Sequence, residues 1–329
     1  MTDWNDLARN SLAGLVPSRA QALAVLEAPE DELLGLLDAA FRVRQRYHGR
    51  DVRIHVLRNA KSGLCPEDCA FCSQSVHFQS GVDRYPLQSV EMLVQGARDA
   101  AALGAVKYCM VTSTRGPSDR DLDTLCEAVR RIKAELTIHV CTSLGLLKPG
   151  QAERLAAAGV TRFNHNLESS RAYFPAVCTT HAYDERIATV RAAKAAGLEA
   201  CCGGILGMGE SLEDRVGLAF ELRELQVESI PVNFLDPRPG TPLEGSPRLS
   251  PQDCLRALAM FRFVNPSRDI RVAGGREVNL RHLQPLALYP ANSLFCNGYL
   301  TTPGQGPEAD LRMIADAGFR VAELVTASP

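Results

Sequence analysis

The sequence predicts an α/β protein whose main body is a (β/α)₈ barrel of the TIM type. From Val52 onward, a short β-rich run, a polar or glycine-containing loop and a helical stretch follow one another, and this unit recurs about eight times. Alternating strands and helices indicate a parallel sheet, and eight units favour closure into a barrel. A doubly wound open sheet is the alternative. Neither a Gly-x-Gly-x-x-Gly fingerprint nor a phosphate-loop lysine motif accompanies the first unit.

The expected elements follow from residue spacing. Residues 4–49 are expected to form helices, because apolar residues recur at helical spacing and Pro17 and Pro29 interrupt them. The expected strands are 52–57, 106–112, 136–143, 162–168, 199–206, 229–235, 269–273 and 293–300. The expected helices are 89–103, 119–134, 150–158, 183–196, 211–225, 251–263, 281–288 and 307–317. Boundary signals are Ser118, Ser250 and Pro251 at helix starts and Gly104, Gly159 and Gly197 after helix ends. These elements give a helical lead-in (1–49), a barrel (50–320) and a tail (321–329).

Composition bounds the class of protein. The chain has 329 residues, of which 46% are hydrophobic, so it can bury a large core. A net charge of −2 and a pI near 6.4 give no electrostatic argument for nucleic acid or an anionic membrane as partner. No apolar run approaches the ~18–20 residues that cross a bilayer. Because the N-terminus also lacks the pattern of a secretory signal, we expect a cytoplasmic protein.

Three of the eleven cysteines, Cys65, Cys69 and Cys72, lie within eight residues. Iron–sulfur clusters are usually held by four thiolates, so a trio without a near fourth predicts a [4Fe-4S] cluster with one iron open to a ligand. Disulfides would require an oxidising compartment. Structural zinc normally needs a second Cys or His doublet, which is absent nearby, although His77 keeps zinc as an alternative.

Strand alternation predicts a polar barrel interior, because residues two apart in a strand face the same way. In 162–168, Asn164, Asn166 and Glu168 share one face, opposite Phe163 and Leu167. In 136–143, the same test puts Ile138 and Val140 on one face. The opposite face then carries Thr137, His139, Cys141 and Ser143. Ordinary barrels are filled with bulky branched side chains. A polar lumen therefore predicts that the barrel itself holds the site.

Other expected strands carry further candidates, namely Cys109, Cys201, Asn233 and Arg271. A lone cysteine in an apolar strand is usually a small buried hydrophobe. Cys109, Cys141 and Cys201 lie in strands two, three and five, however, and strands two to five follow one another around a closed barrel. These three thiols can converge on a second metal centre.

Several stretches together resemble a known family. Asn59-Ala60-Lys61-Ser62-Gly63-Leu64 followed by the cysteine trio resembles the radical S-adenosylmethionine enzymes, and the trio's spacing by itself identifies only that superfamily. Further stretches resemble the biotin synthase family, in the same order: Tyr108-Cys109-Met110, Phe163-Asn164-His165-Asn166-Leu167-Glu168, Cys201-Cys202-Gly203-Gly204-Ile205-Leu206-Gly207-Met208-Gly209-Glu210, Arg271-Val272-Ala273-Gly274-Gly275-Arg276-Glu277 and Leu300-Thr301-Thr302-Pro303. The resemblance covers roughly residues 45–320.

The resemblance implies a radical sulfurtransferase that converts dethiobiotin to biotin. It assigns the [4Fe-4S] cluster to Cys65, Cys69 and Cys72, with S-adenosylmethionine bound at the open iron. It assigns the positioning of S-adenosylmethionine to Asn166, Glu168 and Arg186, with backbone near Phe71 against the adenine. Glu168 stands where some relatives have aspartate.

The resemblance also implies a [2Fe-2S] cluster that donates sulfur, with Cys109, Cys141, Cys201 and Arg271 as its ligands. Without the resemblance, Arg271 would be expected to clamp a carboxylate, because guanidinium is nearly always protonated. The resemblance places Asn166 and Asn233 at the ureido end of dethiobiotin. It places Thr301 and Thr302 at the carboxylate. Arg271 and Asn166 are the expected catalytic residues.

The implied partners are a flavodoxin or ferredoxin as electron donor and a second copy of the chain in a homodimer. The remaining cysteines are expected to be ordinary buried side chains: Cys126, Cys178, Cys202, Cys254 and Cys296. A hydrogenase-cofactor maturase or a methylornithine-synthase-like mutase would share the first cluster but would not need the second set of ligands. A non-catalytic iron–sulfur or zinc carrier would have no use for a polar lumen.

Overall fold

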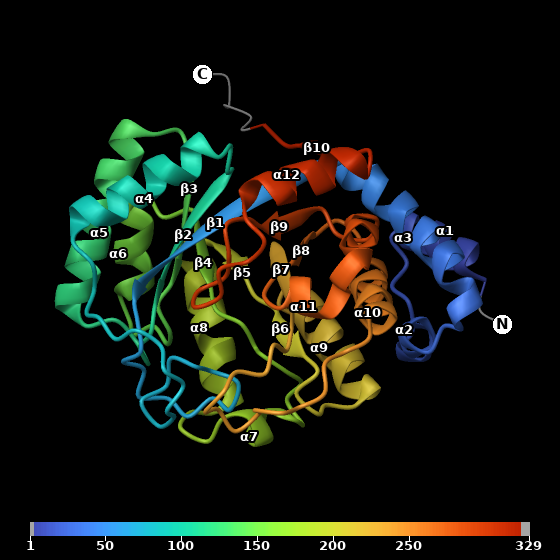
Figure 1. Cartoon of the computed structure of the whole chain (residues 1–329), viewed down its shortest axis with the longest axis horizontal. Coiled ribbons are helices and arrows are strands. Elements are labelled where there is room, and N and C mark those ends of the chain that lie inside the picture. The colour runs from blue at the N-terminus through green and yellow to red at the C-terminus, as the bar shows by residue number, and fades with distance from the viewer. Residues whose placement is uncertain (1–2, 324–329) are drawn as a thin grey trace.

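Eight parallel strand positions close into a barrel, as the alternating pattern predicts (Figure 1). The structure, a computed structural model, describes residues 3–323. Each strand pairs in parallel with the next, and β9 pairs with β1 to complete the ring. The strands are β1 (Asp51–Lys61), β2 (Lys107–Thr112), β3 (His139–Ser143), β4 (Arg162–Asn164), β5 (Glu199–Cys201), β6 (Gly204–Leu206), β7 (Ser229–Phe234), β8 (Asp269–Val272) and β9 (Ser293–Phe295).

The fifth strand position is divided between β5 and β6, both of which pair with β7. Gly203 lies at the break, where a Cβ atom would come within 1.9 Å of the Pro231 carbonyl oxygen. The close approach of the two backbones requires glycine there. The single strand expected over 199–206 is therefore wrong in detail, because its middle passes too near β7 to continue the ladder.

Two other expected strands are shorter than predicted. The fourth ends at Asn164, and Glu168 adopts a left-handed backbone with φ of 68° and forms a bridge with Gly204. The third begins at His139. Thr137 precedes the strand, and His139 is exposed at its start. His139 shares the face of Cys141, as alternation predicts, but it lies at the open start of the barrel and does not line the cavity.

Helices surround the barrel and connect successive strands (Figure 1). They are α4 (Val90–Ala102), α5 (Asp119–Glu135), α6 (Gln151–Ala158), α7 (Phe174–Val177), α8 (Tyr183–Ala195), α9 (Leu212–Glu224), α10 (Pro251–Val264), α11 (Arg276–Leu280), the 3₁₀ helix η2 (Arg281–Leu288) and α12 (Pro307–Asp316). The predicted caps are confirmed, because Ser118 and Ser250 each accept a hydrogen bond from a backbone N–H in the first turn. The helix expected over 281–288 is a 3₁₀ helix with Pro285 inside it. The short α7 is not among the expected helices.

The expected N-terminal lead-in is helical and packs on the outside of the barrel. It consists of α1 (Trp4–Leu12), α2 (Arg19–Leu26), the 3₁₀ turn η1 (Glu30–Glu32) and α3 (Leu33–His48). These helices lie against α10, on the right of Figure 1. At the other end of the chain, β10 (Arg320–Val321) pairs with the start of β1 outside the ring. From residue 324 on, the predicted tail lies outside the described residues.

The core lies between the strands and the helices, where the outward-facing strand residues are apolar, for example Ile54, Val140 and Ile230. The inward-facing residues are largely polar and line a cavity of about 280 Å³. Long loops after β1 and β9 border this cavity, and the loop after β1 lies at the bottom of Figure 1. Within residues 3–323, every helix is too short or too polar to cross a membrane.

Candidate active site

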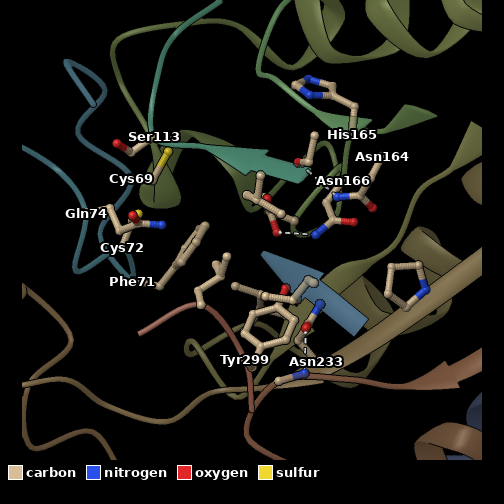
Figure 2. A pocket seen from close by; sticks show the side chains of 18 of the residues that line it. Cys69, Phe71, Cys72, Gln74, Ser113, Asn164, His165, Asn166, Asn233 and Tyr299 are labelled. Carbon is tan, nitrogen blue, oxygen red and sulfur yellow. Dashed lines mark hydrogen bonds between the residues drawn. The ribbon is translucent and has the colours of Figure 1, made fainter. Parts of the chain in front are cut away.

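The loop that follows β1 brings the cysteine trio to the mouth of the barrel. Its backbone folds back on itself through hydrogen bonds from Cys65 N–H to the Gln74 carbonyl (3.1 Å) and from Cys72 N–H to the Cys69 carbonyl (2.9 Å). Cys65, Cys69 and Cys72 all line the cavity. Figure 2 shows Cys69, Cys72 and Phe71 on one side of it.

The trio fits an iron–sulfur cluster chemically. Burial raises the pKa of Cys72 to about 12 and also raises the pKa of Cys65. Without a metal, burial would keep these thiols neutral. Bound iron would instead hold them as thiolates. His77, which kept zinc as an alternative, hydrogen-bonds the Pro66 carbonyl (2.9 Å) and does not line the cavity. All eleven cysteines are free thiols, so the disulfide alternative is excluded.

Asn166, Glu168 and Arg186 come together in the same cavity. Asn166 and Glu168 follow β4, and Arg186 reaches in from α8. The Arg186 Nη1 atom lies 3.4 Å from Glu168 Oε1 and donates to the Asn166 carbonyl at 2.8 Å. Asn166 Nδ2 donates to Glu168 Oε2 at 3.4 Å, one of the contacts drawn in Figure 2. Burial raises the pKa of Glu168, and the Arg186 guanidinium opposes that rise. Glu168 lines the cavity and has a left-handed backbone.

The second set of thiols also converges. Strand register places Cys109 beside Cys141, and it places Asn164 beside Cys201 one strand further on. The thiols are all buried and line the cavity. The Cys109 side chain hydrogen-bonds Cys141, and together with burial this raises the pKa of Cys109. The sequence predicted that these thiols lie in strands two, three and five, and in the structure all three line one cavity.

Arg271 projects from β8 into this second group. Its Nη1 atom lies 3.4 Å from Cys201 Sγ, and Nη2 donates to Ser229 Oγ at 2.8 Å. Within residues 3–323, the buried Arg271 Nε atom finds no hydrogen-bond acceptor. An unsatisfied buried donor beside three thiols fits a cavity that is built around a further polar group.

Beneath Arg271 lies a charged network that the sequence reasoning missed. Asp269 Oδ2 is 3.3 Å from Arg162 Nη1, 3.6 Å from Arg271 Nη2 and 3.8 Å from His55 Nε2. Burial opposes its ionisation, but the Arg271 and Arg162 guanidinium groups hold the pKa of Asp269 well below its usual value. Burial and Arg271 lower the pKa of His55, which keeps the imidazole neutral. The sequence did contain a signal for this network, because polar residues recur at alternate positions within these strands.

The other expected substrate contacts, Asn233, Thr301 and Thr302, also line the cavity, and the Thr301 hydroxyl lies 3.2 Å from Ser73 Oγ on the trio's loop. Asn233 Nδ2 donates to the Gly204 carbonyl (3.0 Å), and its Oδ1 accepts from Gly274 N–H (2.9 Å), which leaves one amide hydrogen free. Thr301 and Thr302 line the cavity from the loop after β9. Tyr299, on the same loop, was missed by the sequence reasoning and lies beside Asn233 in Figure 2.

Of the five remaining cysteines, four are ordinary buried side chains as expected: Cys126, Cys202, Cys254 and Cys296. Cys202 packs in the core outside the barrel and does not line the cavity. Cys178 differs, because its Sγ atom lies 3.2 Å from Asp68 Oδ1 and 3.3 Å from His181 Nδ1.

Comparison with known proteins agrees with this site. Residues 60–222 match the radical SAM superfamily, and residues 231–320 match the Biotin and Thiamin Synthesis associated domain. The chain is 60% identical over 319 residues to a biotin synthase of Salinibacter ruber, with 97% of this chain and 89% of the relative covered. It is 49% identical over 321 residues to a biotin synthase of Geobacillus thermodenitrificans, with 98% and 97% covered.

Solved structures share the fold. Methylornithine synthase superposes with a TM-score of 0.83 at 19% identity over 96% of this chain and 97% of that one. The FeFe-hydrogenase maturase of Carboxydothermus hydrogenoformans gives a TM-score of 0.81 at 18% identity over 96% and 78%. At these identities the likeness shows the barrel architecture alone. The sequence relatives settle the family, and the chain belongs to the biotin synthase family of radical S-adenosylmethionine enzymes.

Proposed function

We propose that this chain converts dethiobiotin to biotin by inserting sulfur, the last step of biotin biosynthesis. The observation that carries the proposal is that two separate groups of thiols line one cavity together with Asn166, Glu168 and Arg186. A related radical enzyme, such as a maturase or a mutase, would not need the second group. Membership of the family implies an iron–sulfur cluster and S-adenosylmethionine.

We assign the [4Fe-4S] cluster to Cys65, Cys69 and Cys72, and a [2Fe-2S] cluster to Cys109, Cys141, Cys201 and Arg271. When bound, the first cluster supplies the electron that cleaves S-adenosylmethionine to a hydrogen-abstracting radical, and the second supplies the sulfur that replaces the two abstracted hydrogens. Iron–sulfur potentials reach about −700 mV, which is low enough for such a reduction.

The side chains near the trio complement S-adenosylmethionine. The Glu168 carboxylate suits its ammonium group, and the Arg186 guanidinium suits its carboxylate, because charged hydrogen bonds are the strong ones. The amide of Asn166 has one hydrogen left after it donates to Glu168, and its Oδ1 accepts from Gly203 N–H at 3.1 Å. The Phe71 backbone is placed to meet the adenine.

Other groups in the wall of the cavity suit dethiobiotin. Asn166 and Asn233 have amide hydrogens for the ureido oxygen, and Thr301 and Thr302 offer hydroxyl donors for the carboxylate. The Thr302 N–H is already bonded to the Tyr299 carbonyl at 2.8 Å. Arg271 holds the second group of thiols against the substrate side. The enclosed cavity limits access of water, which protects a radical from side reactions. We further propose a cytoplasmic homodimer that receives its electrons from a flavodoxin or a ferredoxin.

The test is anaerobic reconstitution with iron and sulfide, followed by incubation with dethiobiotin, S-adenosylmethionine and a low-potential reductant. We expect biotin and 5′-deoxyadenosine. If Mössbauer spectra verify both clusters and no biotin forms, the proposal is wrong.

A matched pair of variants tests the second cluster. Cys141→Ala should lose the absorption of that cluster and keep the first. Cys202→Ala, which removes a buried thiol that does not line the cavity, should keep both. Full second-cluster absorption in Cys141→Ala would contradict the ligand assignment.

A further inference from the structure

A network of polar side chains lies beside the trio, and Arg186 is its one member with a role proposed above. It joins the trio's loop to the segment 178–181, between α7 and α8. Asp68 Oδ1 accepts from Thr179 N–H (2.9 Å) and Thr180 N–H (3.2 Å), and Ala70 N–H donates to the Val177 carbonyl (2.9 Å). The segment is therefore fixed against the loop that carries Cys69.

His181 is the centre of this network. Arg186 Nε donates to His181 Nε2 at 2.8 Å. Because a guanidinium only donates, His181 Nε2 must be the unprotonated nitrogen, and the proton sits on Nδ1. The Nδ1–H group faces Glu67 Oε2, with Cys178 Sγ at 3.3 Å. Glu67 is held in turn by Arg115 Nη1 at 2.9 Å. The contacts form a chain in which Arg186 donates to His181 and His181 donates to Glu67.

The far end of this chain is a cluster ligand. Arg186 Nη2 lies 3.8 Å from Cys69 Sγ, and the guanidinium lies 5.2 Å from the ring centroid of Phe174. Arg186 and Cys69 are both buried. A positive charge fixed beside a sulfur ligand stabilises the reduced, more negative cluster, and buried charges are little screened by salt.

A metal ion is the other occupant to consider for this network. The ligand atoms of Glu67, Cys178 and His181 lie within 4.8 Å of one another. However, Arg186 already donates to His181, and Arg115 already pairs with Glu67. Two guanidinium groups occupy the places where an added cation would gain its attraction. Hydrogen bonding therefore accounts for the network better than a metal does.

We propose that His181 and Glu67 are positioning residues: His181, oriented by Glu67, holds the Arg186 guanidinium against Cys69 and thereby raises the reduction potential of the cluster on the trio. The inference rests on the cluster assignment in the proposed function. It does not depend on what the substrate is.

The test is an EPR-monitored redox titration of the reconstituted full-length protein. In His181→Ala, the Nε–H group of Arg186 loses its acceptor, while Nη1 keeps the Asn166 carbonyl. The cluster should become harder to reduce, by about tenfold in the reduction equilibrium constant, which is 59 mV for a one-electron couple. His181→Gln, which keeps an acceptor and a donor, should recover part of that shift. His48→Ala is the matched control, because it removes a half-buried histidine that hydrogen-bonds the Arg268 carbonyl at 3.1 Å, away from the cavity. It should leave the potential unchanged.

Glu67→Gln should shift the reduction potential in the opposite direction. It keeps the proposal testable if His181→Ala fails to assemble its cluster. It removes a negative charge near the cluster and keeps an acceptor for His181, so its cluster should become easier to reduce. General damage to the loop would not shift the two variants in opposite directions. Unchanged potentials with intact clusters would overturn the proposal, as would stoichiometric zinc that the wild type retains and His181→Gln loses. A shift without biotin formation would leave this inference standing and refute only the proposed substrate.

Discussion

Replacing Asp269 with asparagine tests whether one carboxylate balances the positive charge beneath the second group of thiols. Asp269 is buried, with 3% of its surface exposed. Its Oδ2 atom is 3.3 Å from Arg162 and 3.6 Å from Arg271, and its Oδ1 atom accepts from Ser293 Oγ at 2.5 Å. Asparagine preserves the shape and one acceptor oxygen, replaces the other oxygen with an NH2 donor, and removes the charge.

The magnitude follows from the partners that remain. Arg162 keeps Glu199 at 2.8 Å, whereas within residues 3–323 Arg271 has no second carboxylate partner. The substitution therefore leaves one buried charge uncompensated, which costs about 3–5 kcal/mol. The control is Asp121→Asn, which breaks a partly exposed pair with Lys61 at 3.0 Å. That pair is worth about 1 kcal/mol or less.

The assay is urea unfolding of the metal-free protein under anaerobic, reducing conditions, followed by circular dichroism. We expect the free energy of unfolding to fall by about 3–5 kcal/mol for Asp269→Asn with an unchanged denaturant slope. Equal losses of unfolding free energy in the two variants would refute the reasoning, because burial of the charge pair would then make no difference to its contribution. A loss below about 1 kcal/mol for Asp269→Asn would refute it as well.

Three further predictions follow from the same structure. Neighbouring arginines depress the pKa of Asp269 in the folded protein. The ionised carboxylate therefore stabilises the fold fully above its unfolded pKa of about 3.9, and this stabilisation is lost as the pH falls toward the folded pKa. Below about pH 4, the urea midpoint should fall more steeply with pH for the wild type than for Asp269→Asn. Glu168→Gln should raise the KM for S-adenosylmethionine at least about tenfold, measured as 5′-deoxyadenosine formation, because a charged hydrogen bond is lost; an unchanged KM would contradict this role. Gly203→Ala should destabilise by about 3 kcal/mol in urea unfolding, because its Cβ meets the Pro231 carbonyl, whereas Gly217→Ala in α9 finds only an ordinary 3.7 Å contact and should be neutral or stabilising.

Local pattern was sufficient for most of the fold. Ser118 and Ser250 cap helices where their side chains can accept a backbone N–H, and this depends only on adjacent residues. The pattern failed where two distant segments touch. The break at Gly203 exists because β7 passes within contact distance, and the exposure of His139 depends on where the barrel closes.

The candidate site divides in the same way. The spacing of the trio and the polar face of Asn164, Asn166 and Glu168 were legible as sequence, because a short loop and one strand each carry their own geometry. Asp269 and His55 were not singled out, although Asp269 alternates with Arg271 in one strand, because their ion pairs join them to residues of other strands.

The sequence by itself determined the barrel, the cysteine trio and the three candidate thiols in strands two, three and five, because periodicity and spacing are local properties of the chain. Only the tertiary structure decided that Cys109, Cys141 and Cys201 meet beside Arg271, and that Glu67, His181 and Arg186 form a chain of contacts to Cys69. The physical reason is that hydrogen bonds and charge pairs act over a few ångströms, while a contacting pair such as Cys69 and Arg186 is separated along the chain by 117 positions.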